Sequence, residues 1–166
     1  MAHFHHKSVT EPIAVAGFQI RTSNAKELSG QGQIHALWQR FFAENLMRQI
    51  PNRTGDSLYV VYSNYASDEN GEYDYLLGAP VSTIEALPAG VTFAAIATGE
   101  YAAVTTDRGP VAEVMQKAWK EIWQIAPEEL GGERAFLTDY EIYDERAADP
   151  TAAVVEIRLG IEATPE

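Results

Sequence analysis

The residues with the clearest chemical potential lie in one short stretch, Phe136-Leu-Thr-Asp-Tyr-Glu-Ile-Tyr143. Its aromatic and β-branched residues predict a strand. On a strand, alternation places Asp139, Glu141 and Tyr143 on one face. A carboxylate among aromatic rings is costly unless it is paired or solvated. Two interpretations follow: Glu141 lies in a cavity that accepts a cation, or this is the solvated face of an edge strand.

Aromatic residues elsewhere are candidates for the walls of such a cavity. Trp119 and Trp123 are four residues apart on a predicted helix and therefore lie together on its flank. Tyr62 and Tyr143 occur in strand-like segments and could flank a cleft. Each also has a plain structural interpretation, because tryptophans often pack helices and tyrosines often form cross-strand pairs. Trp38 lies within an apolar stripe, which favours a core position.

The charge of the chain limits its partners. Its 166 residues include 24 acidic and 12 basic side chains, for a formal net charge of −12. Because affinity for nucleic acid comes largely from neutralising phosphates, we expect no direct binding of DNA or RNA. An acidic field attracts cations instead. Cysteine is absent, which excludes disulfides, thiolate metal sites and a cysteine nucleophile.

No targeting, membrane or cofactor signal is apparent. No apolar run approaches the roughly 20 residues of a membrane span, and no apolar region follows the N-terminus as in a signal peptide. Three of the four histidines lie within residues 1–10, which we expect to be a flexible tail rather than a metal site. We expect a cytoplasmic protein with no metal and no organic cofactor.

Hydrophobic periodicity predicts the order strand, helix, strand, strand, twice over. In the first half we expect a strand at 12–22, a helix at 34–49, and strands at 58–65 and 72–82. In the second half we expect strand-like segments within 91–105, a helix from about 110 to 126, and strands at 136–143 and 152–161. These ranges describe an α+β domain over residues 11–166.

Matching residues in the two halves indicate an internal duplication. Trp119 and Tyr143 follow Trp38 and Tyr62 at the same interval, and the Gly78–Gly160 interval is one residue longer. We therefore predict two repeats, at about 11–85 and 86–166. Each would be a small antiparallel sheet with one main helix, and pseudo-twofold packing would leave a central cleft, where ligands commonly bind.

Several short motifs occur in order along the chain. They are Val15-Ala-Gly-Phe18, Leu37-Trp-Gln-Arg-Phe41, Tyr59-Val-Val-Tyr62, Pro88-Ala-Gly90, Gly99-Glu-Tyr101, Ala118-Trp-Lys-Glu-Ile-Trp123 and Tyr140-Glu-Ile-Tyr143. From about residue 11 onward, this set resembles the effector-binding domain of the GyrI-like superfamily. That domain forms the C-terminal part of multidrug-responsive regulators of the AraC and MerR types. It also occurs alone, as in integron-associated cationic-drug-binding proteins.

The resemblance implies two strand-helix-strand-strand units around a pocket for bulky, lipophilic aromatic cations. It matches Glu141 to the family's buried pocket glutamate, in a Phe/Tyr-Glu-x-Tyr motif. Trp119, Tyr101 and Phe18 become candidate walls of the pocket. The regulators also carry a basic DNA-binding domain, which this sequence lacks, so we expect the sensor part alone. Asp139 raises a further possibility: if it also faces inward, one carboxyl is protonated or the site favours a dication.

Three functions remain open at this stage. The first is a binding module for hydrophobic cations in drug sensing, transcription regulation or sequestration. The second is a hydrolase of cyclopropane-containing genotoxins, known in the same superfamily, with the pocket glutamate activating water. The third is an acidic protein inhibitor of a DNA enzyme. The sequence offers no second catalytic group, which favours binding and predicts no enzyme. A homodimer is compatible with exposed sheet edges.

Overall fold

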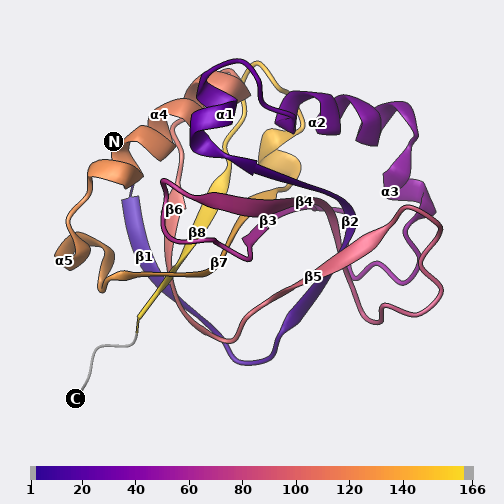
Figure 1. The fold of residues 1–166 in the computed structure, drawn as a ribbon, viewed down its shortest axis with the longest axis horizontal. Coiled ribbons are helices and arrows are strands. Elements are labelled where there is room, and N and C mark those ends of the chain that lie inside the picture. Colours follow the sequence, from indigo (N-terminus) through magenta and orange to yellow (C-terminus); the bar gives the residue numbers. More distant parts are fainter. Residues whose placement is uncertain (1–2, 163–166) are drawn as a thin grey trace.

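A computed structural model describes residues 3–162, which fold into one antiparallel sheet with helices on one side (Figure 1). The first half contains β2 (Ile13–Ser23), α1 (Asn24–Leu28), α2 (Ile34–Ala43), α3 (Leu46–Gln49), β3 (Leu58–Ser63) and β4 (Glu72–Val81). The second half contains β6 (Gly99–Thr105), α4 (Val111–Gln124), α5 (Pro127–Leu130), β7 (Arg134–Tyr143), the 3₁₀ turn η1 (Glu145–Ala147) and β8 (Glu156–Ile161). Two further strands, β1 (His3–Val9) and β5 (Thr92–Ile96), precede the two halves.

The strand order β1-β6-β8-β7-β3-β4-β2-β5 is symmetric about its centre. There β3 and β7, equivalent strands of the two halves, pair antiparallel with Val60 opposite Glu141. At the margins the halves exchange strands, because β1 pairs with β6 and β5 pairs with β2. This architecture confirms the expected duplicated α+β fold. The strand-like segments expected within 91–105 form β5 and β6, and β1 is an added strand.

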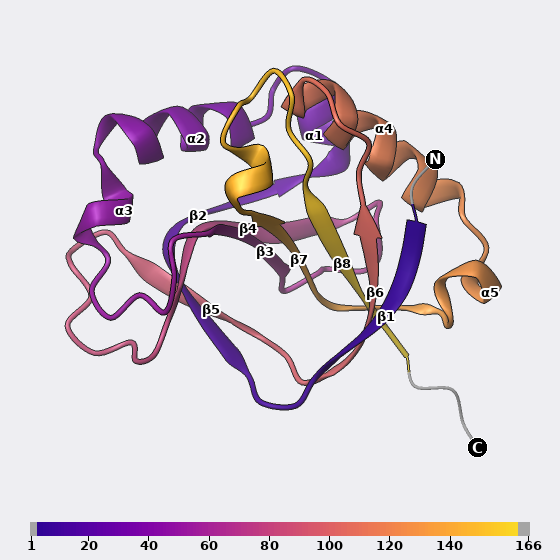
Figure 2. The same cartoon turned by 180° about the vertical axis from the view of Figure 1, so that it is seen from behind.

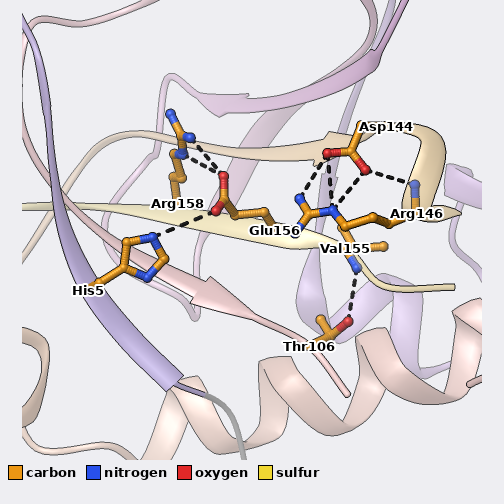
Figure 3. Close-up of polar contacts among 7 residues, drawn as sticks. All are labelled: His5, Thr106, Asp144, Arg146, Val155, Glu156 and Arg158. Carbon is orange, nitrogen blue, oxygen red and sulfur yellow. Dashed lines mark hydrogen bonds and ion pairs between the residues drawn. The ribbon is translucent and has the colours of Figure 1, made fainter. Parts of the chain in front are cut away.

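Strand β1 corrects the expectation that residues 1–10 form a flexible tail. Residues 3–9 pair along the whole of β6, while Met1 and Ala2 lie outside the described residues. Figure 3 shows His5 of β1 directed at Glu156 of β8. The distance from His5 Nε2 to Glu156 Oε1 is 3.8 Å. The same carboxylate accepts a hydrogen bond of 2.7 Å from Arg158. Pairing with β1 covers the edge of β6 that would otherwise be unpaired. Because this edge lies far away in the sequence, the residues around 3–9 do not by themselves predict the strand.

The two faces of the sheet bury different cores. Helices α1, α2 and α4 lie on one side in both views (Figures 1 and 2). Beneath α2 lies a core that includes Phe18, Phe41 and Leu77, and beneath α4 lies another that includes Ala118 and Ile157. The opposite face holds a third core, which includes Val15, Val61, Ile96, Tyr101 and Tyr140. Strand alternation therefore decides which residues can reach the helices.

Each main helix presents two neighbouring stripes. On α4, Val114, Ala118 and Ile122 are buried against the sheet at four-residue spacing. The adjacent stripe, which includes Trp119 and Trp123, is only partly buried. In the part of the chain that the structure describes, no helix is long and apolar enough to cross a membrane.

Candidate binding site

A cavity of about 530 Å³ lies over the centre of the sheet, with walls from α1, α2 and α4 and a floor from β3, β4 and β7. Its lining is mostly aromatic and aliphatic. Its lining residues include Asn24, Leu28, Ile34, Trp38, Tyr62, Tyr65, Tyr73, Tyr75, Val111, Met115, Trp119, Trp123, Arg134, Glu141 and Tyr143. Its volume is in the range of pockets that enclose drug-sized molecules.

Glu141 lies at the floor of this cavity and is almost completely buried. The Tyr62 hydroxyl donates to Oε2 at 2.7 Å, the Trp119 indole N–H donates to the same oxygen at 2.9 Å, and the Tyr143 hydroxyl donates to Oε1 at 2.7 Å. Burial raises the pKa of Glu141 above its ordinary value, while the three hydrogen bonds oppose the rise. Within residues 3–162, no cationic side chain forms an ion pair with this carboxylate.

The arrangement around Glu141 follows the internal duplication. Tyr62 and Tyr143 are equivalent residues, and each donates to one carboxylate oxygen. The equivalent tryptophans cross over between the halves. Trp119 of α4 packs on Tyr62 with ring centroids 5.3 Å apart, and Trp38 of α2 packs on Tyr143 at 5.0 Å. The duplication therefore supplies matched aromatic walls, and Glu141 breaks the symmetry because Val60 lies opposite it.

Asp139, two residues before Glu141, lies on the same face of β7 but is already neutralised. Its Oδ2 accepts hydrogen bonds from Tyr65 and from the guanidinium of Arg134, and its Oδ1 accepts one of 2.9 Å from the Gly160 backbone N–H. Arg134 lines the cavity and Asp139 does not. Glu141 is therefore the buried carboxylate of the cavity lining that has no charge partner and that a ligand can reach.

Five of the seven residues proposed from sequence line this one cavity: Glu141, Trp119, Trp123, Tyr62 and Tyr143. Their roles in binding a ligand stay predictions. Trp38, expected in the core, packs against that core and also lines the cavity, because it lies four residues after Ile34 on the same flank of α2.

Tyr101 and Phe18 do not line the cavity, which corrects their assignment. Tyr101 lies on the opposite face of the sheet, where its hydroxyl donates to the Ala97 carbonyl at 2.7 Å. Phe18 is on the helix side but is buried beneath α2, edge-on to Phe41 with centroids 6.5 Å apart. Both residues are aromatic and therefore suited to a pocket wall. Tyr101 is excluded by the face of its strand, and Phe18 by its position beneath α2.

The solvated-edge interpretation of residues 136–143 is also wrong for the acids. Strand β7 lies at the centre of the sheet, paired with β3 and β8, so Asp139 and Glu141 are both buried. The alternation fails only near the start of the strand. There Phe136 has φ +50° and the register with β8 shifts, which leaves Leu137 exposed.

Sequence reasoning missed several lining residues, above all Tyr65, Tyr73, Tyr75 and Arg134. Tyr73 and Tyr75 alternate on β4, and their spacing of two residues was a usable signal for a shared face. Tyr65 lies in the connection after β3. Arg134 could not be found from its neighbours, because its contact with Asp139 depends on the irregular start of β7.

Comparisons with known proteins agree with this architecture. The family model described as "Cass2: Integron-associated effector binding protein" matches residues 9–161. The putative transcriptional regulator protein YobU of Bacillus subtilis (strain 168) is 32% identical over 160 residues, which cover 96% of this chain and 98% of YobU. The chain belongs to the Cass2 family of integron-associated effector binding proteins.

Solved structures place this Cass2 family member in the GyrI-like α+β fold. The integron cassette protein VCH_CASS2, from the mobile metagenome of Vibrio cholerae, has a TM-score of 0.73 and 25% identity, with 96% of this chain and 95% of that chain covered. The structure of SAV2435 bound to tetraphenylphosphonium has a TM-score of 0.77 and 15% identity, with 96% and 94% covered. At that identity the likeness to SAV2435 shows the fold alone.

The raised pKa of Glu141 predicts how stability depends on pH. Between the ordinary value of 4.5 and the raised value, the folded protein retains a proton that the unfolded chain has lost. The free energy of unfolding therefore falls as pH rises through this interval. Glu141→Gln cannot titrate, so its stability relative to the wild type should increase from pH 4 to pH 8. Urea unfolding of both proteins across this range measures the difference, and a constant or shrinking difference would contradict it.

Proposed function

We propose that this Cass2 family protein binds bulky, lipophilic aromatic cations in the cavity around Glu141 and acts in drug sensing, transcription regulation or sequestration. The observation that carries the proposal is the state of Glu141. Its carboxylate is buried, receives three hydrogen bonds from neutral donors, and has no cationic partner within the described residues. A cation in the cavity would supply the missing charge.

The lining makes such binding favourable for physical reasons. A cation near a buried carboxylate gains Coulombic attraction at low effective dielectric. Each aromatic face that the cation meets adds roughly 0.5–2 kcal/mol of cation–π attraction. Tyr62, Tyr143 and Trp119 surround Glu141 and are held by hydrogen bonds to it. Neither kind of attraction requires one ligand shape, so the cavity is suited to several lipophilic cations.

The relatives support the same class of ligand and role. SAV2435, which shares the fold, was solved with tetraphenylphosphonium, a lipophilic cation carrying four aromatic rings. YobU, the sequence relative, is named as a putative transcriptional regulator. These names fit a protein that responds to an organic cation, and the chemistry of Glu141 is the reason for extending that ligand class to this chain.

The direct test is a titration of the protein with tetraphenylphosphonium, followed by intrinsic fluorescence. All three tryptophans of the chain line the cavity, so a bound ligand should change the emission strongly. We expect saturable binding and recovery of the ligand unchanged by chromatography. The proposal would be contradicted if neither tetraphenylphosphonium nor a rhodamine dye bound to the protein. Chemical conversion of a cyclopropane-containing compound would instead favour the hydrolase.

The positive charge of the ligand should matter more than its shape. Triphenylphosphine oxide and methyltriphenylphosphonium both carry three phenyl rings on phosphorus, and the oxide has no net charge. We expect the oxide to bind at least about tenfold more weakly than methyltriphenylphosphonium, because it leaves Glu141 without a counter-charge. Competition titrations against a bound rhodamine dye measure both affinities under one set of conditions. Equal affinity would mean that aromatic burial alone drives binding.

A further inference from the structure

The ion pair between Arg134 and Asp139 stands in the wall of the cavity beside Glu141. Asp139 is completely buried, and the side chain of Arg134 is 11% exposed. The guanidinium carbon lies 4.4 Å from the ring centroid of Phe136 and 5.9 Å from that of Trp119. Arg134 thus has the surroundings expected of a bound organic cation: a carboxylate on one side and aromatic faces beside it.

Asp139 is held in place by groups other than Arg134. The Tyr65 hydroxyl and the backbone N–H of Gly160 both donate to its carboxylate. Without Arg134, Asp139 would therefore remain a second oriented carboxylate next to Glu141. The two carboxylates already interact, because the charge of Asp139 contributes to raising the pKa of Glu141.

We propose that Arg134 determines the charge specificity of the cavity: by occupying Asp139, it restricts the ligand to one positive charge and excludes dications. This inference rests on the proposed function. With Arg134 in place, Glu141 is the one buried carboxylate of the lining that remains to be neutralised, because the other two lining acids, Glu27 and Glu69, are partly exposed. Beside Glu141, a second cationic group on the ligand would meet the guanidinium instead of a second buried carboxylate, which is unfavourable because like charges repel strongly where water is excluded.

Ethidium and propidium test this proposal, because they share one phenanthridinium ring system and propidium adds a quaternary ammonium group. We expect the wild type to prefer ethidium. In Arg134→Met, the ratio of propidium to ethidium affinity should rise by about tenfold or more, because Asp139 becomes available to the second charge. Fluorescence anisotropy titrations of both dyes give the ratio.

Lys120→Met is the matched control. Lys120 is another cationic residue of the cavity lining, but it is exposed and covers no buried carboxylate. Lys120→Met loses one positive charge, as Arg134→Met does, so any general electrostatic effect appears in both variants. We expect its affinity ratio to change by less than about threefold, because exposed charges are screened. An equal change in both variants, or an unchanged ratio in Arg134→Met, would overturn the proposal.

Two further variants cover the possibility that Arg134→Met fails to fold with an unpaired buried acid. Asp139→Asn leaves Arg134 without its partner, so ethidium should bind more weakly and propidium weaker still. The double variant Arg134→Met/Asp139→Asn buries no lone charge and removes both the repelling guanidinium and the second carboxylate, so its ratio of propidium to ethidium affinity should lie between those of the wild type and Arg134→Met. Opposite results in these variants would overturn the proposal.

The two ways of failing can be told apart. If ethidium binds and depends on Glu141 while the ratio of propidium to ethidium affinity never responds to Arg134, only this inference fails. If neither dye binds the wild type, the proposed function fails with it.

Discussion

Glu141→Gln should weaken the binding of a permanent lipophilic cation at least tenfold, a change of about 1.4 kcal/mol. Glutamine has nearly the same shape, and its amide oxygen can accept from Tyr62 and Trp119 while its NH₂ group donates to the Tyr143 hydroxyl. The cavity should therefore keep its form and lose its negative charge. Titration of tetraphenylphosphonium into both proteins, with circular dichroism to verify the fold, measures the effect.

Glu69→Gln provides the matched control for this prediction. Glu69 also lines the cavity, and it is more exposed than Glu141. The hydrogen bond that Asn24 donates to Glu69 goes to its backbone carbonyl and is preserved in the variant. We expect at most about a threefold loss of affinity, because solvent screens the charge. Equal losses in the two variants would mean that the overall acidity of the cavity, not the carboxylate of Glu141, attracts the ligand.

Gly78→Ala should destabilise the fold by about 3 kcal/mol or more. Gly78 of β4 pairs with Gly17 of β2. A Cβ atom at Gly78 would overlap the carbonyl oxygen of Ala16 and lie 2.8 Å from the Cα of Gly17. These are backbone atoms of a paired strand, so they cannot move aside without breaking the β2–β4 ladder. Thermal unfolding followed by circular dichroism should show a melting temperature roughly 10 °C lower.

Gly55→Ala is the corresponding control. An added Cβ at Gly55 would meet no atom within 4 Å, and its backbone is not in the left-handed region. We expect stability that is unchanged or higher by up to about 1 kcal/mol, because alanine reduces the freedom of the unfolded chain. A small effect at Gly78, similar to that at Gly55, would mean that β2 and β4 separate at this point more easily than their close approach indicates.

Much of the fold was predictable because its signals are local and repeated. The apolar stripes of α2 and α4 and the alternation in β3, β4 and β7 are properties of short segments. The matching Trp38–Trp119 and Tyr62–Tyr143 intervals indicated two related halves, and the structure brings these four residues around one carboxylate. Strand β1 was missed because its formation depends on the unpaired edge of β6, which lies about a hundred residues later.

The sequence alone determined the chemistry available at the site: a strand with a carboxylate among aromatic residues, an acidic chain, and tryptophans at helical spacing beside the core. The tertiary structure decided which of these groups meet. Sheet alternation turned Tyr101 to the opposite face, and the position of β7 at the centre of the sheet buried Glu141. The irregular start of β7 brought Arg134 onto Asp139. The physical reason is that residue type fixes what a side chain can do, whereas charge pairing and burial depend on neighbours that only strand pairing brings together.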